Sequence, residues 1–284
     1  MLIKNAIILL LLLNLVGCGG GGGGVQPTIY PVVSLSTSHA SVTENSGTTV
    51  TLTVTASKIS DEDITVTLST SGTATDGTDY SAVNGSSLTI TAGTTTATKT
   101  FTITDNSIYE GNETVIVAIS TVSGGSATEN GTQTETITIT ENESAPVITL
   151  ATSHTTVAEN SGITITLTAT SSQVADEDVV VTLASSGTAT NGTDYSSLGG
   201  QTITISAGLT TGTITGTPTD DSIYEDDEVA AIAISTVSGG GATESGTQSV
   251  SITITENESA PTVTLATSTS SVTENSGTTV TLTA

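Results

Sequence analysis

Apolar and hydroxyl-bearing residues alternate along several short segments of this chain. In residues 48–55, valine and leucine occupy every second position and threonine fills the positions between them. The same alternation runs through residues 64–68, and in residues 114–120 the large apolar residues Val115, Val117 and Ile119 keep the period of two. Because successive side chains of a strand point to opposite faces, each segment is predicted to be a β-strand with one apolar and one polar face.

Seven such strands are predicted between Pro31 and Ala145, with turn residues between them. They lie at residues 32–35, 48–55, 64–68, 87–91, 98–104, 114–120 and 132–140. Strands with one apolar face suit two antiparallel sheets packed face to face. Seven strands in a segment of this length are typical of an immunoglobulin-like sandwich. We therefore expect an all-β fold.

The whole pattern occurs more than once. Residues 146–260 align with residues 31–145 at a constant offset of 115 positions, without insertion or deletion, and a truncated third copy occupies residues 261–284. A fixed period is the sequence signature of repeated structural units. The prediction is a tandem array of seven-strand sandwiches, in which residues 31–145 are repeat one and residues 146–260 are repeat two.

The strand predicted at residues 98–104 differs between the two copies at two apolar positions. Phe101 and Ile103 of repeat one become Gly216 and Pro218 in repeat two. These changes remove apolar area and one backbone donor from that strand. Repeat two is therefore predicted to be the less stable domain.

The amino terminus has the pattern of an export signal. Lys4 precedes an apolar run at residues 6–13, which is short for a membrane span and typical of the apolar region of a signal peptide. The following Leu-Val-Gly-Cys, ending at Cys18, resembles the lipobox of bacterial lipoproteins. The resemblance implies that residues 1–17 are cleaved and that Cys18 carries the lipid. The alternative is an ordinary signal peptide with a chance cysteine.

Residues 18–30 are predicted to be a flexible tether, because six consecutive glycines follow Cys18. Two or more acyl chains anchor a protein stably to a bilayer, so the membrane is an expected partner through the lipid. The same resemblance implies that glycine after the lipidated cysteine favours the bacterial outer membrane or cell surface. Cys18 is the only cysteine, so no disulfide stabilises the exported domains.

The chain is strongly acidic, with 28 Asp and Glu against three Lys and a formal charge of -25. Nucleic acid is excluded as a partner class, because its binding requires Lys and Arg to neutralise phosphates. Divalent cations are the natural counter-charge. Low aromatic content with high charge can also indicate disorder, but the ordered alternation of apolar residues argues against it.

The acidic residues gather at predicted connections that share one end of each sandwich. Consecutive antiparallel strands alternate in direction, so the first, third and fifth connections and the exit of the seventh strand lie together. In repeat one this acidic end is predicted to hold Glu44, Asp79, Asp105, Glu110, Glu113, Glu141 and Glu143. The corresponding residues of repeat two are Glu159, Asp194, Asp220, Glu225, Glu228, Glu256 and Glu258. Asp221 replaces Asn106, which adds one more acid to the second set.

Carboxylates this close repel one another unless protons or a cation sit among them. Calcium takes six to eight oxygen ligands in irregular geometry, whereas magnesium demands a stricter octahedron. These fifteen residues are therefore predicted to be Ca²⁺ ligands. The alternative is that the acids serve solubility, as expected for residues 61–63 and Glu129 at the opposite end.

Four motifs of repeat one, each found again in repeat two, resemble the Calx-beta domain family. They are SVTENSG at residues 41–47, GTATDGTDY at 72–80, DNSIYEGNE at 105–113 and TITITENE at 136–143. The resemblance implies a seven-strand sandwich that binds calcium at one end. It places ligands at Glu44, Asp79, Asp105, Glu110, Glu159, Asp194, Asp220, Asp221 and Glu225. The Glu-Asn-Glu exits at 141–143 and 256–258 depart from the family's aspartate runs, which implies fewer ions or weaker binding.

The predicted function is that of a calcium-binding, membrane-anchored repeat protein. The exit of each last strand leads directly into the next repeat, so calcium there would stiffen the array into a rod. The alternative is an adhesin whose binding domain, for a surface protein or a glycan, lies beyond residue 284, with metal-free structural repeats. Catalysis is not expected, since His39 and His154 adjoin no motif that would make either one a base.

Overall fold

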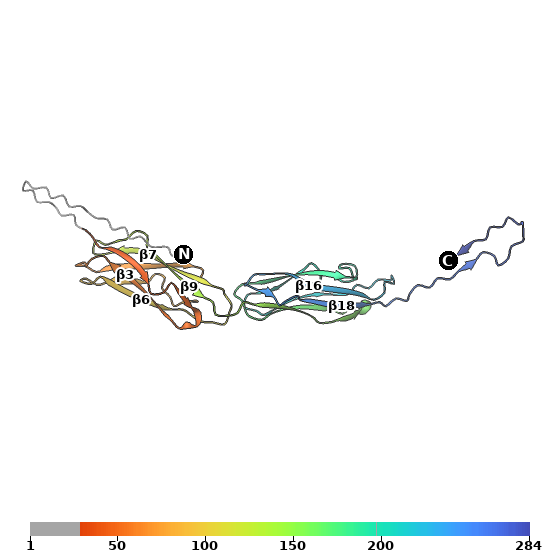
Figure 1. Ribbon diagram of the computed structural model, residues 1–284, viewed down its shortest axis with the longest axis horizontal. Coiled ribbons are helices and arrows are strands. Elements are labelled where there is room, and N and C mark those ends of the chain that lie inside the picture. Colours follow the sequence, from red (N-terminus) through yellow and green to blue (C-terminus); the bar gives the residue numbers. More distant parts are fainter. Residues whose placement is uncertain (1–28, 197) are drawn as a thin grey trace, which may run out of the picture.

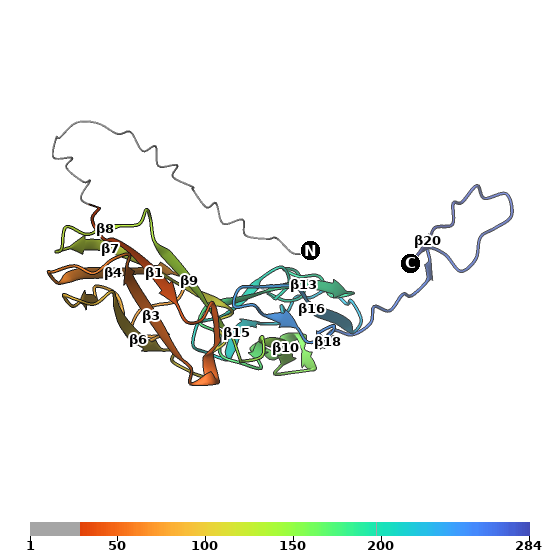
Figure 2. The ribbon, with the colours of Figure 1, turned by 60° about the vertical axis from the view of Figure 1, so that its left-hand side comes forward.

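The computed structural model describes residues 29–196 and 198–284, and it contains two β-sandwiches arranged end to end (Figures 1 and 2). Each sandwich corresponds to one repeat. A small hairpin of β19 (Ala266–Thr267) and β20 (Leu282–Thr283) follows them. The described residues contain no α-helix. The predicted all-β fold of tandem sandwiches is confirmed, whereas the signal peptide and Cys18 lie outside the described residues.

All seven predicted strands of repeat one are present. The strands are β1 (Val32–Thr37), β2 (Ser41–Thr43), β3 (Thr49–Ala56), β4 (Ile64–Gly72), β5 (Ser87–Ile90), β6 (Thr96–Thr102), β7 (Glu113–Ser123), β8 (Thr128–Glu129) and β9 (Thr134–Thr140). The short strands β2 and β8 are additional, because segments of two or three residues are too short to show a period. The strands of repeat two are β10 (Val147–Thr152), β11 (Thr156–Ala158), β12 (Ile165–Ser171), β13 (Val179–Gly187), β14 (Thr202–Ile205), β15 (Thr211–Gly216), β16 (Glu228–Ser238), β17 (Thr243–Glu244) and β18 (Ser249–Thr255).

Each sandwich consists of a four-stranded and a five-stranded sheet. In repeat one the strand orders are β6-β3-β1-β8 and β2-β9-β7-β4-β5, and repeat two has the equivalent orders. The first two strands belong to different sheets, because β1 pairs antiparallel with β3 whereas β2 pairs parallel with β9. This crossing brings the chain that follows β2 to the same end as the exit of β9.

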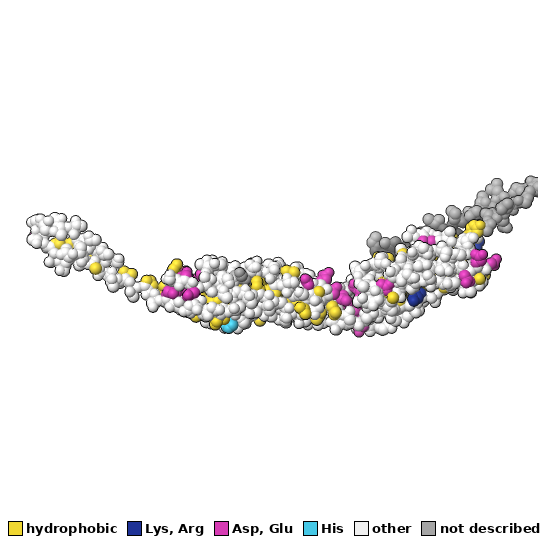
Figure 3. All heavy atoms as spheres, turned by 180° about the vertical axis from the view of Figure 1, so that it is seen from behind, with side chains coloured by type: hydrophobic (Ala, Val, Ile, Leu, Met, Phe, Trp, Pro, Cys, Tyr) yellow, Lys and Arg dark blue, Asp and Glu magenta, His cyan; other side chains and the backbone are white. Residues whose placement is uncertain are grey.

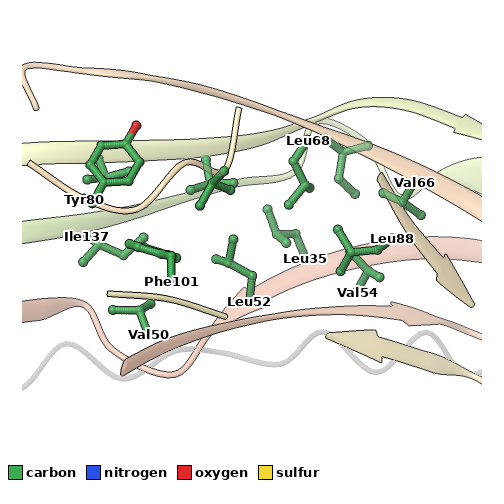
Figure 4. Close-up of a cluster of buried hydrophobic side chains, with 14 of the residues drawn as sticks. Leu35, Val50, Leu52, Val54, Val66, Leu68, Tyr80, Leu88, Phe101 and Ile137 are labelled. Carbon is green, nitrogen blue, oxygen red and sulfur yellow. The ribbon is translucent and has the colours of Figure 1, made fainter. Parts of the chain in front are cut away.

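The apolar face of the strands forms a separate core in each repeat. Val50, Leu52 and Val54 are fully buried, as their alternation predicts (Figure 4). Burying each such side chain contributes about 1.5–3 kcal/mol. Near the acidic end, the rings of Tyr80 and Phe101 pack edge to face, with 5.6 Å between their centroids. The core therefore extends to the base of the loops that carry the acids.

Repeat two fills the position of the missing phenylalanine in a different way. A Cβ on Gly216 would lie 2.7 Å from Leu198 Cγ, so Leu198 occupies space next to the glycine. The corresponding residue of repeat one is the smaller Val83. The hydroxyl of Tyr195, which corresponds to Tyr80, is buried without a hydrogen-bond partner in the described residues. Repeat two thus recovers part of the apolar volume but leaves a buried polar atom unpaired.

The acidic end of repeat one faces the opposite end of repeat two. Acidic side chains gather between the two sandwiches, and again toward the outer ends of the pair (Figure 3). Besides the covalent link, Tyr109 of repeat one forms an isolated β-bridge with Ala175 of repeat two. The candidate site of repeat one therefore lies at the joint between the domains.

Candidate metal centres

Twelve of the fifteen predicted ligands converge into four clusters of three carboxylates. Within each cluster, the residues offer oxygens that all lie within 4.8 Å of one another. The clusters of repeat one are Glu44 with Glu141 and Glu143, and Asp79 with Glu110 and Glu113. Those of repeat two are Glu159 with Glu256 and Glu258, and Asp194 with Glu225 and Glu228. Each acidic end thus carries two adjacent groups of oxygen ligands.

Glu44 is held in its cluster by a short 3-10 turn. The turn spans Glu44–Ser46 directly after β2, and Gly47 ends it in the left-handed region at φ 63°. This conformation favours glycine, which explains the Glu-Asn-Ser-Gly sequence at this position. The Glu44 side chain is only 4% exposed. The backbone therefore fixes a buried carboxylate at the acidic end.

The Glu44 carboxylate has acidic neighbours and no hydrogen-bond donor in the part of the chain that the structure describes. Burial, followed by the charges of Glu141 and Glu110, raises the pKa of Glu44 to about 7. A buried anion without a donor or counter-ion is costly. This position is therefore favourable for a bound cation, which would supply the missing positive charge.

Glu141 organises the loops around the first cluster. Its carboxylate accepts hydrogen bonds from four backbone N–H groups: Glu110 (2.6 Å) and Gly111 (2.8 Å) at Oε2, Asn142 (2.9 Å) and Glu143 (3.0 Å) at Oε1. Although burial opposes it, this set of hydrogen bonds holds the pKa of Glu141 below its usual value. Glu141 thus joins the β6–β7 loop to the exit of β9 and stays ionised.

Glu143 completes this cluster with an oxygen that nothing else uses. Its Oε2 is buried and has no hydrogen-bond partner in the described residues. The adjacent Glu141 carboxylate, with which a proton on Glu143 could be shared, raises the pKa of Glu143, and burial adds to this effect. The Glu-Asn-Glu exit therefore has two roles: its first glutamate positions the loops, and its second offers a free oxygen.

Repeat two reproduces the same arrangement. Glu256 accepts backbone N–H bonds from Glu225 (2.6 Å), Asn257 (2.8 Å) and Glu258 (2.8 Å). These bonds lower the pKa of Glu256 to about 2. Glu258 Oε2 is buried without a partner among the described residues. The adjacent Glu256 carboxylate, with which a proton on Glu258 could be shared, raises the pKa of Glu258 to about 7. The orphaned oxygen is therefore a property of both repeats.

The second cluster of each repeat is built on the turn after β4 or β13. Asp79 is 6% exposed and accepts a 2.6 Å hydrogen bond from the Thr75 N–H, which closes this turn. Burial, followed by the charges of Asp79 and Glu110, raises the pKa of Glu113 to about 7. In repeat two, burial and a hydrogen bond to Asp194 raise the pKa of Glu228 to about 7. These clusters also favour a proton or a cation.

Asp105, Asp220 and Asp221 are the predicted ligands that do not enter a cluster. Asp221 Oδ1 instead accepts a 2.7 Å hydrogen bond from the Ile223 N–H, and its own N–H donates to Glu159 Oε1 at 3.4 Å. Asn106 caps Ile108 in the same way. Asn106 and Asp221 therefore have the same role as the cap of their loop, and the difference between them does not alter the number of clustered carboxylate oxygens.

The space inside the acidic end of repeat two is small. A cavity of about 10 Å³ is lined by carboxylates that include Glu159, Asp194, Glu228 and Glu256. This volume is close to that of one water-sized sphere. It is suitable for a single ion and too small for an organic ligand.

One acid near the site was not among the predicted ligands. Asp176 of repeat two lies in the loop between β12 and β13, and its charge contributes to raising the pKa of Glu110 and Glu113 in repeat one. This loop lies at the end of repeat two opposite its own acidic end, and the tandem arrangement brings it against the acidic end of repeat one.

The fold and these clusters define a class of protein: tandem β-sandwiches with paired carboxylate clusters at the end of each sandwich. The family model of the Calx-beta domain matches residues 27–143 and 141–258. The chain belongs to the Calx-beta family.

Several solved structures are similar to the chain at low identity. The CBD12 region of CALX1.2 is 16% identical, with a TM-score of 0.36, over 79% of this chain and 100% of that one. The calcium binding domain CBD12 of CALX1.1 is 18% identical, with a TM-score of 0.33, over 70% and 78%. The Yersinia pseudotuberculosis adhesin InvE is 14% identical, with a TM-score of 0.34, over 83% and 61%. No curated protein matches the chain. Membership of the family therefore rests on the family match.

No helix that is long and apolar enough to cross a membrane occurs within residues 29–196 and 198–284.

Proposed function

We propose that this protein is a membrane-anchored spacer of Calx-beta repeats, stiffened by Ca²⁺ bound at the acidic end of each repeat. The observation that carries the proposal is the Glu44 carboxylate, which is buried, lacks a donor in the described residues and lies within a cluster of acids. The orphaned oxygens of Glu143 and Glu258 support it. A divalent cation would neutralise these groups and supply their missing partner.

The donor set favours calcium among divalent cations. Every side-chain ligand of the four clusters is a carboxylate, and no His or Cys takes part. Calcium prefers oxygen ligands and accepts irregular geometry with six to eight of them, whereas zinc prefers nitrogen and sulfur. Backbone carbonyls and water would complete its coordination. Domains outside the cell commonly bind calcium at about 10⁻⁴ to 10⁻³ M, so such sites would respond to calcium in the medium.

The position of the clusters links binding to mechanics. Glu141 ties the β6–β7 loop to the exit of β9, and the chain from Glu143 reaches β10 within a few residues. Neutralising the clusters would therefore hold together the two segments that face repeat two. The expected result is a narrower range of angles between the repeats.

Anchoring is the part of the proposal that rests on the sequence alone. Cys18 at the end of the lipobox-like segment would carry the lipid, and the glycine run would separate the first sandwich from the bilayer. Metabolic labelling with a radioactive fatty acid tests it: label should enter the wild-type chain, and Cys18→Ser should abolish the labelling. Equal labelling of both chains would contradict the anchor.

Isothermal titration calorimetry of the chain, freed of Ca²⁺ with a chelator beforehand, tests the binding itself. We expect saturable binding in the micromolar to millimolar range and a raised melting temperature, since a ligand at a hundredfold excess over Kd stabilises by about 2.7 kcal/mol. Glu44→Gln should weaken binding to repeat one, and Glu135→Gln, outside every cluster, should not. Absence of heat and of any thermal shift at millimolar Ca²⁺ would overturn the proposal.

A further inference from the structure

Repeat two is attached to repeat one by a β-bridge as well as by the covalent link. Tyr109 lies in the β6–β7 loop of repeat one, and Ala175 lies in the β12–β13 loop of repeat two. The Tyr109 N–H donates to the Val174 carbonyl at 2.9 Å, and the Asp176 N–H donates to the Tyr109 carbonyl at 3.3 Å. Two backbone hydrogen bonds across the domain boundary therefore set the register of one domain against the other.

The ring of Tyr109 extends this contact to the turn between β16 and β17. A Cβ added to Gly241 would lie 2.5 Å from Tyr109 Cε1 and 2.9 Å from its hydroxyl oxygen. Real Cβ atoms do not approach ring atoms this closely, because carbon contacts are optimal at about 3.5–4.0 Å. The ring can therefore occupy this place only while residue 241 has no side chain.

Repeat one carries a serine at the matching position. Ser126 has a φ of 53°, close to the 60° of Gly241, so both residues lie in the left-handed region. A ring docked on repeat one in the way that Tyr109 docks on repeat two would meet the Cβ of Ser126. Serine is thus compatible with the turn itself but not with the contact that Gly241 makes.

The surroundings of the two turns differ accordingly. In repeat two, Val174, whose carbonyl accepts the Tyr109 N–H, is half-buried. In repeat one, the equivalent Ile59 is 61% exposed, and a pocket of about 360 Å³ that includes Ile59 and Ser126 is open at this end. The same end of the sandwich is therefore docked against another repeat in repeat two, whereas in repeat one no other repeat of the described chain covers it.

We propose that Tyr109 is the docking residue for the following repeat, and that the residue at position 241 determines whether a repeat accepts a preceding one. Glycine admits the tyrosine of a preceding Calx-beta repeat, whereas serine, as at Ser126, marks a repeat that begins an array. The determinant lies on the receiving domain and acts by steric fit. It operates whether or not the acidic clusters hold an ion.

The charges at the joint oppose the contact between the repeats. Docking brings Asp176 toward the second cluster of repeat one, where Asp79 contributes, after burial and Glu177, to raising the pKa of Asp176. A contact that adds like charge to an acidic end needs a compensating attraction. The two backbone hydrogen bonds and the seated ring of Tyr109 provide it.

Amide hydrogen exchange of the full chain with Gly241→Ser tests the proposal. The Tyr109 and Asp176 amides should exchange at least about tenfold faster, because they are protected by the joint alone. The Ala242 amide, which donates to the Gly239 carbonyl within the turn, should keep its protection. Unchanged exchange at Tyr109 and Asp176 would overturn the proposal, as would a loss of protection that spreads to Ala242 and shows that the turn has unfolded.

Two further variants make the result specific. Ser126→Gly alters the matching turn of repeat one and should leave the Tyr109 and Asp176 amides unchanged. In the Tyr109→Ala background the clash no longer exists, so Gly241→Ser should have no further effect on the Asp176 amide. An equal effect of Gly241→Ser with and without the Tyr109 ring would contradict steric exclusion.

Discussion

The carboxylate of Glu141, at the exit of β9, accepts a 2.6 Å hydrogen bond from the backbone N–H of Glu110 in the β6–β7 loop. This bond joins two segments that are far apart in the sequence and that each contribute to a different carboxylate cluster. It therefore couples the two clusters of repeat one to each other and to the segment that leads into repeat two.

Glu141→Gln should loosen this end of repeat one. In glutamine an amide nitrogen replaces one of the two carboxylate oxygens, and this nitrogen cannot accept hydrogen bonds. The two backbone N–H groups that bond to the replaced oxygen would therefore lose their acceptor. Hydrogen bonds to charged groups contribute about 1.5–3 kcal/mol, and we expect a loss of this order in the free energy of unfolding. Thermal or denaturant unfolding measures it. A variant as stable as the wild type would show that Glu141 does not organise the loops.

The calcium-free chain should become less stable to unfolding as the pH rises. Glu44, Glu113, Glu228 and Glu258 have pKa values of about 7 in the folded chain, against 4.5 as their ordinary value. A carboxyl with a raised pKa favours folding when protonated, so this contribution is complete below about pH 4.5 and is lost as the pH rises through about 7.

Melting temperatures between pH 5 and 8 test this, with and without Ca²⁺. We expect a decline in chelator and a flatter profile with Ca²⁺, which replaces the protons. Below about pH 4.5 the trend should reverse, because Glu141 and Glu256 have lowered pKa values and become protonated there. A chelated chain that is more stable at pH 8 than at pH 5 would contradict the account.

Glu44→Gln and Glu159→Gln should act on one repeat each. Removing a buried charge that is surrounded by other acids should raise the melting temperature of the calcium-free domain at pH 8. The same change removes a cation ligand, so the rise in melting temperature caused by Ca²⁺ should shrink in that repeat alone. Each variant is the control for the other. An effect of Glu44→Gln on repeat two as large as that on repeat one would argue against separate sites.

Gly216→Ala should destabilise repeat two, although alanine is the smallest possible enlargement. The added Cβ would overlap the Ser196 carbonyl oxygen and lie 2.7 Å from Leu198 Cγ. Overpacking of this kind costs about 1–3 kcal/mol. Unfolding should show a lower midpoint for repeat two and an unchanged one for repeat one. A gain in stability would mean that the strand has unfilled space beside Leu198.

The wild-type repeats should also differ in stability. Repeat two lacks the Tyr80–Phe101 ring pair, and its Tyr195 hydroxyl has no partner in the described residues. We expect two thermal transitions, with the lower one assigned to repeat two by amide exchange. The opposite order would show that Leu198 more than compensates for the lost phenylalanine.

The strands and the acidic ends could be predicted from the sequence because both depend on local patterns. Alternation fixes which residues face the core, as the full burial of Leu52 shows, and the alternating direction of strands brings distant loops together. Twelve of the predicted ligands accordingly share clusters. Short elements such as β2 and β8 have no such signal, since their pairing is set by tertiary contacts.

The features that the sequence did not reveal depend on side-chain geometry and on the second domain. Asp221 caps its own loop through Oδ1, a contact that spacing alone does not encode. Asp176 and Tyr109 act across the joint, which no single repeat contains. Gly241 opposite Ser126 is visible as a difference between the copies, but its meaning appears only when the ring of Tyr109 is seen against it.

Pulsed electron-spin distance measurement tests the central claim most directly. Spin labels at Thr98→Cys and Thr213→Cys, equivalent exposed positions of the two repeats, report the separation of the domains in a Cys18→Ser chain. We expect a narrow distance distribution with Ca²⁺ and a clearly broader one after chelation, with the change lost in Glu44→Gln combined with Glu143→Gln. A distribution of the same width in Ca²⁺ and in chelator would contradict calcium as the stiffening agent of this array.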